Sequence, residues 1–136
     1  MIWLTTDAAV DAKKRLAGIG FVIHNTNRSI DHRVARQISY QDNHHAEFMA
    51  VLAAVEMLVT NYPAVAQETV ILQTDSQIVQ DSLEKRYAKH YQVETDQILR
   101  LTDQLSLFLI QLISDRTNHA AHQLARQAIY GENAIN

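Results

Sequence analysis

The sequence has no cysteine, only one proline and only three glycines among its 136 residues. The lack of cysteine excludes a disulfide framework, a thiolate zinc site and a cysteine nucleophile, and it is compatible with a reducing compartment. Because 47% of the residues are hydrophobic, the composition is typical of a globular protein with short loops. A chain of this length can bury one core, so we expect residues 1–136 to form a single domain.

The sequence also lacks an excess of basic charge and a long apolar run. Its formal net charge of −3 argues against binding of polyanions through a large basic face, although it leaves a local basic patch possible. Residues 1–7 show no signal-peptide pattern. The most apolar stretch, residues 46–59, carries two glutamates and is shorter than the roughly 20 residues that span a bilayer. We therefore expect a soluble, cytoplasmic protein with no membrane partner, and no obligate protein partner is evident.

Hydrophobic periodicity predicts the order of the strands and helices. Period-2 alternation predicts strands over residues 2–7, 17–23 and 30–39. A change to helical spacing at His44 or His45 predicts a helix that continues to Tyr62 and ends at Pro63. The remaining predictions are strands over 67–74 and 108–113 and helices over 78–83, 93–105 and about 119–130. This order predicts an α/β fold in which an antiparallel meander is joined to parallel crossover units.

The strand over residues 67–74 ends in a carboxylate, Asp75, which is followed by Ser76 and Gln77. An Asp-Ser pair after a strand is ordinary turn and helix-capping chemistry, and this explanation suffices for Asp75 taken alone. An unpaired carboxylate at the end of a buried strand is expensive, however, and requires compensation. The alternative is that other acids converge on Asp75 around a cation.

Two further acids lie at the edges of apolar elements. Asp7 falls at the end of the first predicted strand, and Glu47 is expected in the first turn of the first helix, on the same stripe as Ala50 and Val51. A first-turn glutamate also gains from the helix macrodipole whatever its function. If the three acids meet, they need a cation, and hard oxygen ligands at that density suit Mg²⁺ or Mn²⁺.

Two other segments allow both a structural and a functional interpretation. Residues 84–91 form a basic and aromatic connector that is either a solvated loop or a contact patch for phosphates and sugars. Asn118 is a plausible N-cap for the last helix, and His122 is expected on the same side as Ala125 and Ile129. A histidine in that position is usually a core or boundary residue.

Five motifs, taken in order, carry a family resemblance: Thr6-Asp7-Ala8-Ala9, Ala17-Gly18-Ile19-Gly20, Asn43-His44-His45-Ala46-Glu47-Phe48-Met49-Ala50, Leu72-Gln73-Thr74-Asp75-Ser76-Gln77 and Asn118-His119-Ala120-Ala121-His122-Gln123-Leu124-Ala125. Together they resemble the ribonuclease H type 1 family, and more closely its short reverse-transcriptase-like branch. The resemblance runs from Thr5 to about Ala128, nearly the whole chain. Each motif alone would be weak, whereas the ordered set is specific.

The resemblance implies a five-stranded mixed sheet flanked by helices, and a two-metal site that hydrolyses the RNA strand of RNA/DNA hybrids. Asp7, Glu47 and Asp75 match three of the family's four acids, and His122 stands where the fourth belongs. The site would then hold three negative charges instead of four. Because imidazole is a poor Mg²⁺ ligand, we expect weaker Mg²⁺ binding and a shift towards Mn²⁺, with activity retained.

The resemblance also implies nucleic-acid contacts. Asn43, His44 and Gln77 fall where the family reads the minor groove and the ribose 2′-hydroxyl, which distinguishes RNA from DNA. The family usually has a second asparagine at the position of His44. The basic handle of some cellular members is reduced here to Lys85, Arg86 and Lys89, and the loop at residues 114–117 lacks the mobile histidine of longer members.

Three functions therefore compete. The first is a hybrid-specific endoribonuclease. The second is a catalytically weak or inactive ribonuclease H-like domain that binds nucleic acid, which His122 and the negative net charge favour. The third is a nuclease of the same fold that acts on structured DNA or on single strands.

Overall fold

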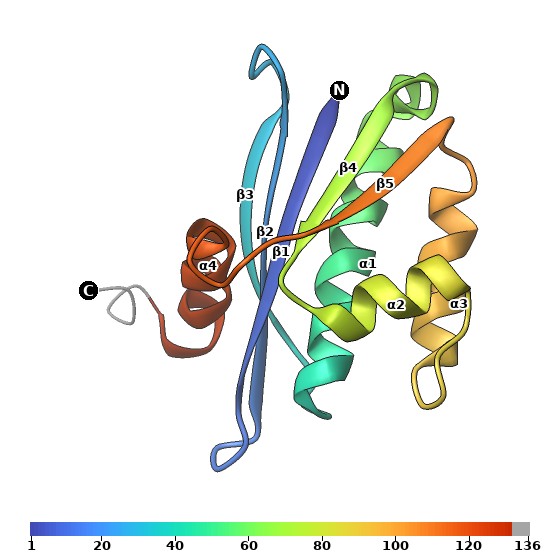
Figure 1. Cartoon of the computed structure of the whole chain (residues 1–136). Helices are drawn as coiled ribbons and strands as arrows, with labels where there is room; N and C mark the ends of the chain where they lie inside the picture. Colours follow the sequence, from blue (N-terminus) through green and yellow to red (C-terminus); the bar gives the residue numbers. More distant parts are fainter. Residues whose placement is uncertain (132–136) are drawn as a thin grey trace.

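The structure, a computed structural model, describes residues 1–131. A five-stranded sheet in the order β3-β2-β1-β4-β5 forms its middle layer (Figure 1). The elements are β1 (Ile2–Asp11), β2 (Leu16–Asn25), β3 (Asp31–Ile38), α1 (Asn43–Asn61), the short 3-10 helix η1 (Pro63–Gln67), β4 (Thr69–Thr74), α2 (Gln77–Lys85), α3 (Gln92–Thr102), β5 (Leu107–Leu112) and α4 (His119–Tyr130).

The sheet is mixed, as predicted. Strands β1, β2 and β3 form an antiparallel meander, whereas β4 runs parallel to both β1 and β5. The structure therefore confirms the predicted fold class and the order of the elements. Several boundaries differ by one to three residues: α2 is longer than predicted at both ends, α3 ends at Thr102, and β5 begins at Leu107.

The predicted end of the first strand at Asp7 is wrong. Strand β1 continues to Asp11 because it stays paired with β2 as far as Asp11 opposite Leu16. The parallel pairing of β1 with β4 ends earlier, at Thr5 opposite Gln73. Asp7 therefore lies in the middle of its own strand but just beyond the end of β4, where the sheet opens. Such an edge, at the carboxyl ends of parallel strands, is where open α/β sheets usually bind ligands.

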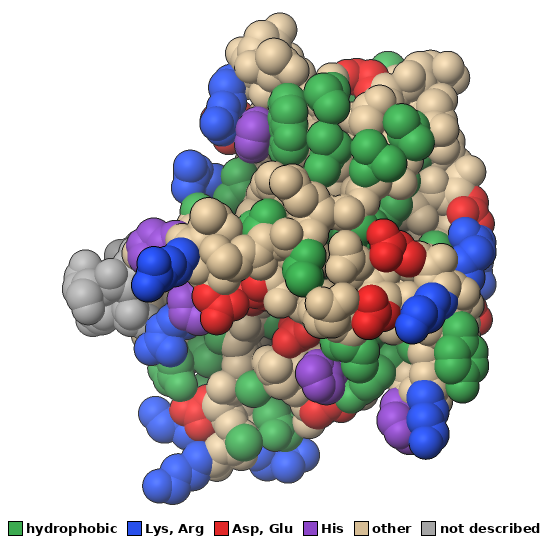
Figure 2. Space-filling model, in the orientation of Figure 1, with side chains coloured by type: hydrophobic (Ala, Val, Ile, Leu, Met, Phe, Trp, Pro, Cys, Tyr) green, Lys and Arg blue, Asp and Glu red, His purple; other side chains and the backbone are tan. Residues whose placement is uncertain are grey.

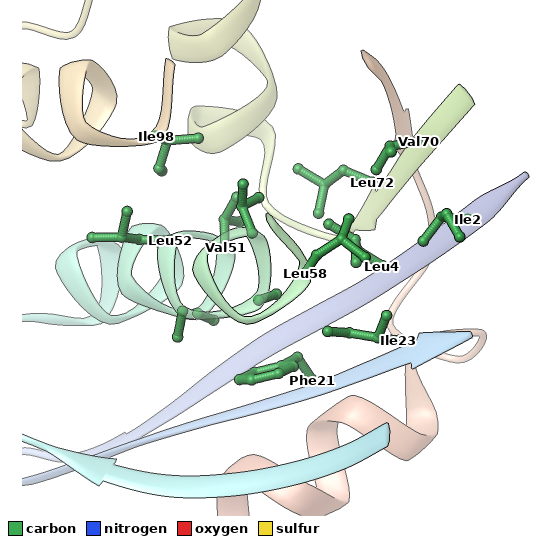
Figure 3. Close-up of a cluster of buried hydrophobic side chains, with 14 of the residues drawn as sticks. Ile2, Leu4, Phe21, Ile23, Val51, Leu52, Leu58, Val70, Leu72 and Ile98 are labelled. Carbon is green, nitrogen blue, oxygen red and sulfur yellow. The ribbon is translucent and has the colours of Figure 1, made fainter. Parts of the chain in front are cut away.

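The main core lies between the sheet and the two helices α1 and α3. Phe21, Leu72 and Leu4 from the sheet face Val51 and Leu58 of α1, and Ile98 of α3 closes the cluster (Figure 3). The stripe predicted on α1 is buried as expected: Ala50, Val51, Ala54 and Leu58 have no exposed surface. Each large apolar side chain buried in this way contributes roughly 1.5–3 kcal/mol, so this face fixes α1 firmly against the sheet.

Helix α4 covers the opposite face, over β1, β2 and β3 (Figure 1). Two glycines of β2 allow its close approach. A Cβ atom at Gly20 would lie 2.3 Å from the carbonyl oxygen of Ala121, and one at Gly18 would lie 2.6 Å from that of Ala125. Neither distance is sterically possible, so only glycine permits this seating of α4. Gly20 is also the partner of Asp7 in the β1–β2 ladder, which brings α4 beside that carboxylate.

None of the helices within residues 1–131 combines the length and the apolar content that a membrane crossing requires.

Candidate active site

A cavity of about 360 Å³ opens at the edge where β1 passes the end of β4. Figure 2 shows acidic and histidine side chains gathered near the middle of this face, with Lys and Arg around its margin. The structure brings together the four predicted catalytic side chains and Asn43. The residues that line the cavity are Asp7, Ala8, Asn43, Glu47, Asp75, Asp115 and His122.

Asp7 is the most enclosed of these carboxylates, with 9% of its side chain exposed. One of its oxygens accepts a hydrogen bond from the backbone N–H of Ala8 at 2.8 Å, and the other lies 2.9 Å from Nδ1 of His122. Burial, together with the charge of Asp75, raises the pKa of Asp7 to about 6, although the contacts with Ala8 and His122 oppose this shift. A buried carboxylate whose pKa is raised by a neighbouring acid is a favourable environment for a cation.

Asp75 follows β4 directly, and Ser76 is the residue that caps α2, where its side chain accepts from the N–H of Val79. The capping interpretation is therefore right for Ser76 and does not account for Asp75. Burial raises the pKa of Asp75, and the nearby carboxylates Asp115 and Glu47 act in the same direction, while a hydrogen bond from Asn118 opposes them.

Glu47 lies in the second turn of α1, not in the first turn as predicted, because the helix already begins at Asn43. The macrodipole explanation for this glutamate is correspondingly weaker. Its carboxylate accepts hydrogen bonds from Asn43, at 2.9 Å, and from the hydroxyl of Ser76. Its side chain is only 16% exposed, so α1 holds it in a fixed orientation towards the cavity.

The start of α1 is braced by α3. Asp42 caps the helix by accepting from the backbone N–H of His45 at 2.8 Å, and the hydroxyl of Tyr91 donates to the same carboxylate at 2.9 Å. The imidazole of His45 lies 2.8 Å from Glu94 of α3. These contacts fix the helical turn that carries Asn43 and Glu47.

Asn118 occupies the N-cap position of α4 as predicted, and its carbonyl accepts from the backbone N–H of His122 at 3.1 Å, but its side chain makes no capping hydrogen bond. That side chain is fully buried, and its amide donates to the backbone carbonyl of Thr6 at 2.9 Å, next to Asp7. His122 follows one turn later and is exposed at the cavity, whereas Ala125 is fully buried. The prediction that His122 lies on the same side of α4 as the buried Ala125 is therefore only partly correct, and His122 is not a core residue.

The donor set fits a hard divalent cation, because carboxylate oxygens dominate the cavity and their mutual repulsion calls for positive charge. Within residues 1–131, no three His, Asp or Glu side chains are already arranged to enclose an ion. An open arrangement of this kind suits Mg²⁺, which usually keeps several waters and takes further oxygens from substrate phosphates. The buried Oδ1 of Asn118 has no hydrogen-bond partner among the described residues, which leaves one more acceptor near Asp75.

A second cavity of about 460 Å³ shares Glu47 and Asp75 with the first, and it is lined by His44 and Gln77 among others. A third, of about 260 Å³, shares Ile78 and Asp81 with the second and reaches Lys85 and Lys89. The three cavities are neighbours in a row, and we call this row the acidic-to-basic groove. Five of the six predicted nucleic-acid contacts line it: Asn43, His44, Gln77, Lys85 and Lys89.

Arg86, the sixth predicted contact, does not line this groove. It lies at the end of α2 with a left-handed backbone (φ 58°), and its guanidinium pairs with Asp103 at 2.6 and 3.1 Å. It lines a separate cavity between α2, α3 and β5.

Asp115 is not among the residues predicted from the sequence, but it lines the same cavity as Asp7 and Asp75 and raises the pKa of Asp75. It belongs to the loop between β5 and α4, where no periodicity draws attention to it. One signal could have found it. Because β5 is parallel to β4, the residues that follow both strands meet at the same edge of the sheet.

Comparisons with known proteins agree with this geometry. Residues 5–128 match the family model described as reverse transcriptase-like. EbsB of Enterococcus faecalis, whose name classes it provisionally as a hydrolase, is 32% identical over 131 residues, which cover 95% of this chain and 94% of EbsB.

Solved structures share the fold at low sequence identity. Ribonuclease H1 of the archaeon Halobacterium salinarum is 21% identical, with a TM-score of 0.81 over 93% of this chain and 96% of that one. The metagenomic LC11 ribonuclease H1, solved in complex with an RNA/DNA hybrid, is 20% identical, with a TM-score of 0.83 over 95% of this chain and 96% of that one.

Proposed function

The chain belongs to the reverse transcriptase-like family, and from this premise we propose that it is a metal-dependent endoribonuclease that hydrolyses the RNA strand of RNA/DNA hybrids. The family match and the ribonuclease H1 structures confirm the predicted family and fold. The activity, the metal and the roles of individual residues are parts of the proposal.

One observation carries it: carboxylates from three separate elements, Asp7 of β1, Glu47 of α1 and Asp75 after β4, line a single cavity. Two divalent ions bound there would lower the pKa of an attacking water and stabilise the leaving 3′ oxygen. The three carboxylates would hold and orient those ions, and the Ala8 N–H and the Ser76 hydroxyl fix Asp7 and Glu47 in place. His122 holds Asp7 or ligates an ion.

The groove supports a hybrid as the substrate. Asn43 lines the same cavity as Glu47 and Asp75, and His44 and Gln77 line the neighbouring cavity that shares these two carboxylates, so all three would contact a ribose bound next to the scissile phosphate. Contact with its 2′-hydroxyl would distinguish RNA from DNA. Lys85 and Lys89 at the far end of the groove would neutralise backbone phosphates. The hybrid bound to LC11 ribonuclease H1 shows that this fold accepts such a duplex in that protein.

The metal is proposed to be Mg²⁺ or Mn²⁺, and a preference for Mn²⁺ is expected if His122 is a ligand, because imidazole ligates Mn²⁺ better than Mg²⁺. We also propose that residues 1–136 act as one domain without an obligate protein partner. We place the protein in the cytoplasm, and the absence of cysteine is compatible with that reducing compartment.

The test is cleavage of an end-labelled RNA/DNA hybrid in Mg²⁺ and in Mn²⁺, with RNA/RNA, DNA/DNA and single-stranded RNA as controls. Asp75→Asn is assayed beside the parent to exclude a contaminating nuclease. We expect cleavage of the hybrid's RNA strand alone, absent in the variant. Cleavage of DNA/DNA or of single strands instead would favour the third function.

A second candidate is a domain that binds nucleic acid without efficient cleavage. The pairing of His122 with Asp7 at 2.9 Å favours it, because that contact occupies an oxygen that an ion would need. Binding of the hybrid by well-folded protein, with no cleavage in either metal, would support this candidate.

A further inference from the structure

The loop that carries Asp115 is fastened at both ends to the residues next to the catalytic aspartates. On one side, the backbone N–H of Ile113 donates to the carbonyl of Thr74, which precedes Asp75, at 2.8 Å. On the other side, Asn118 donates to the carbonyl of Thr6, which precedes Asp7, at 2.9 Å. The loop is therefore held across the two carboxylates.

Between these two attachments the loop forms a tight turn. The backbone N–H of Asn118 lies 3.1 Å from the carbonyl of Ser114 and 3.3 Å from that of Asp115, and the hydroxyl of Thr117 donates to the Ser114 carbonyl at 2.9 Å. The turn leaves Asp115 exposed at the cavity that Asp75 also lines, and the charge of Asp115 raises the pKa of Asp75.

Nothing basic in the cavity neutralises this additional carboxylate. His122 is the only titratable nitrogen donor among the described residues that line it, and its Nδ1 is directed to Asp7. The arrangement places two acids against one another at a site that is otherwise acidic, which is costly unless a cation binds between them.

We propose that Asp115 supplies the fourth carboxylate of the metal site, from the β5–α4 loop, while His122 positions Asp7 and is not itself the main fourth ligand. This inference rests on the proposed function, since it assumes that the cavity binds divalent ions. The cavity then holds four carboxylates, Asp7, Glu47, Asp75 and Asp115, and not the three that the sequence predicts. Asp115 in the β5–α4 loop thus supplies the negative charge that His122 of α4 does not.

The test measures binding of Mn²⁺ alone to the full chain by calorimetry, without nucleic acid. We expect Asp115→Asn to weaken Mn²⁺ binding by about 10- to 100-fold, comparable to the loss of groups that organise a metal site. His122→Ala should weaken it less. Glu56→Gln, which removes one acid of α1 that lines a different cavity, is the matched control and should bind as the parent does.

A double variant sharpens the result. Asp115→Asn combined with His122→Asp moves the carboxylate to the first turn of α4 and should recover much of the lost Mn²⁺ affinity. Thermal unfolding without metal provides a separate readout: Asp115→Asn should unfold at the same temperature as the parent or higher, because repulsion of Asp75 is removed. A lower midpoint without metal would make Asp115 a structural residue and overturn the inference.

The inference and the proposed function can fail separately. Unchanged Mn²⁺ affinity in Asp115→Asn, or a larger loss in His122→Ala, overturns the inference even if the parent cleaves hybrids. Conversely, if the parent binds Mn²⁺ through Asp115 but cleaves no hybrid, the inference stands and the proposed function is overturned.

Discussion

The two ends of the acidic-to-basic groove are built differently. At the acidic end, Asp7 and Glu47 stand on a central strand and a core-packed helix, are 9% and 16% exposed, and are fixed by hydrogen bonds. At the basic end, Lys85 is exposed at the end of α2 and Lys89 is exposed on the connector between α2 and α3. The difference suggests that chemistry depends on the rigid end, whereas affinity for phosphates comes from adaptable side chains.

The largest effect is expected at the rigid end. Glu47→Gln removes one negative charge from the ion site. The lost charge stabilisation should raise the activation free energy by several kcal/mol and so lower the rate of hybrid cleavage on the order of 10³-fold. Single-turnover cleavage of labelled hybrid measures this. Glu56→Gln is the matched control, because Glu56 lies on the same helix about 13 Å further along its axis. Equal rates for the two variants would contradict the assignment of the acidic end.

The next effect tests how α4 is seated. Gly20→Ala places a Cβ against the backbone of Ala121 and Ala125, so α4 must shift, and we expect a loss of about 1–3 kcal/mol in the free energy of unfolding. Urea denaturation measures the loss. Gln37→Ala, at an exposed position on the edge strand β3, is the control and should be close to neutral. If Gly20→Ala were as stable as the parent, the close packing of α4 on β2 would be wrong.

A smaller and different effect is expected at the adaptable end. The double variant Lys85→Gln and Lys89→Gln should weaken binding of the hybrid and reduce the dependence of log affinity on log salt by roughly one unit per lost phosphate contact. The cleavage rate at saturating hybrid should stay unchanged. Fluorescence anisotropy in EDTA measures binding, with Arg100→Gln on α3 as the control. A loss of saturated rate without a loss of affinity would reverse the roles of the two ends.

The smallest effect is expected for Arg86→Gln. The guanidinium of Arg86 is exposed and engaged with Asp103, an ion pair that raises its pKa, so it must leave that partner before it can bind a phosphate. Its loss should lower hybrid affinity less than Lys85→Gln does in the same anisotropy assay. A larger loss than that of Lys85→Gln would show that Arg86 leaves Asp103 and becomes the main phosphate contact.

Much of the fold follows from local patterns. Alternation and helical spacing predict each strand and α-helix in order, though not the 3-10 helix η1, and the stripe of Ala50, Val51 and Ala54 correctly places Glu47 at the end of a buried face. The extent of β1 does not follow, because residues 8–11 are held in the strand by pairing with β2 and carry little alternation of their own. The position of Asp7 at the opening of the sheet depends on where β4 ends.

The residues that make up the site are harder to predict from the sequence than the strands and helices are. Motif spacing indicates Asp7, Glu47 and Asp75, but the partner of His122 depends on how closely α4 packs on Gly20. Asn118 is the N-cap residue that the sequence predicts, but its side chain binds the carbonyl of Thr6 and so attaches α4 to β1, a contact that the local sequence does not show. Asp115 reaches Asp75 through a turn whose direction is set by hydrogen bonds at both of its ends. Such long-range contacts leave no periodic signal.

The most direct test of the central claim is a cleavage map on a hybrid whose labelled strand contains a block of ribonucleotides flanked by deoxyribonucleotides, paired with DNA, in Mg²⁺ and in Mn²⁺. The account predicts cuts only within the ribonucleotide block, lost in Asp75→Asn, because the groove requires the 2′-hydroxyl and the acidic end requires its carboxylates. Cuts that extend through the deoxyribonucleotide flanks, or no cuts in either metal by folded protein, would contradict it.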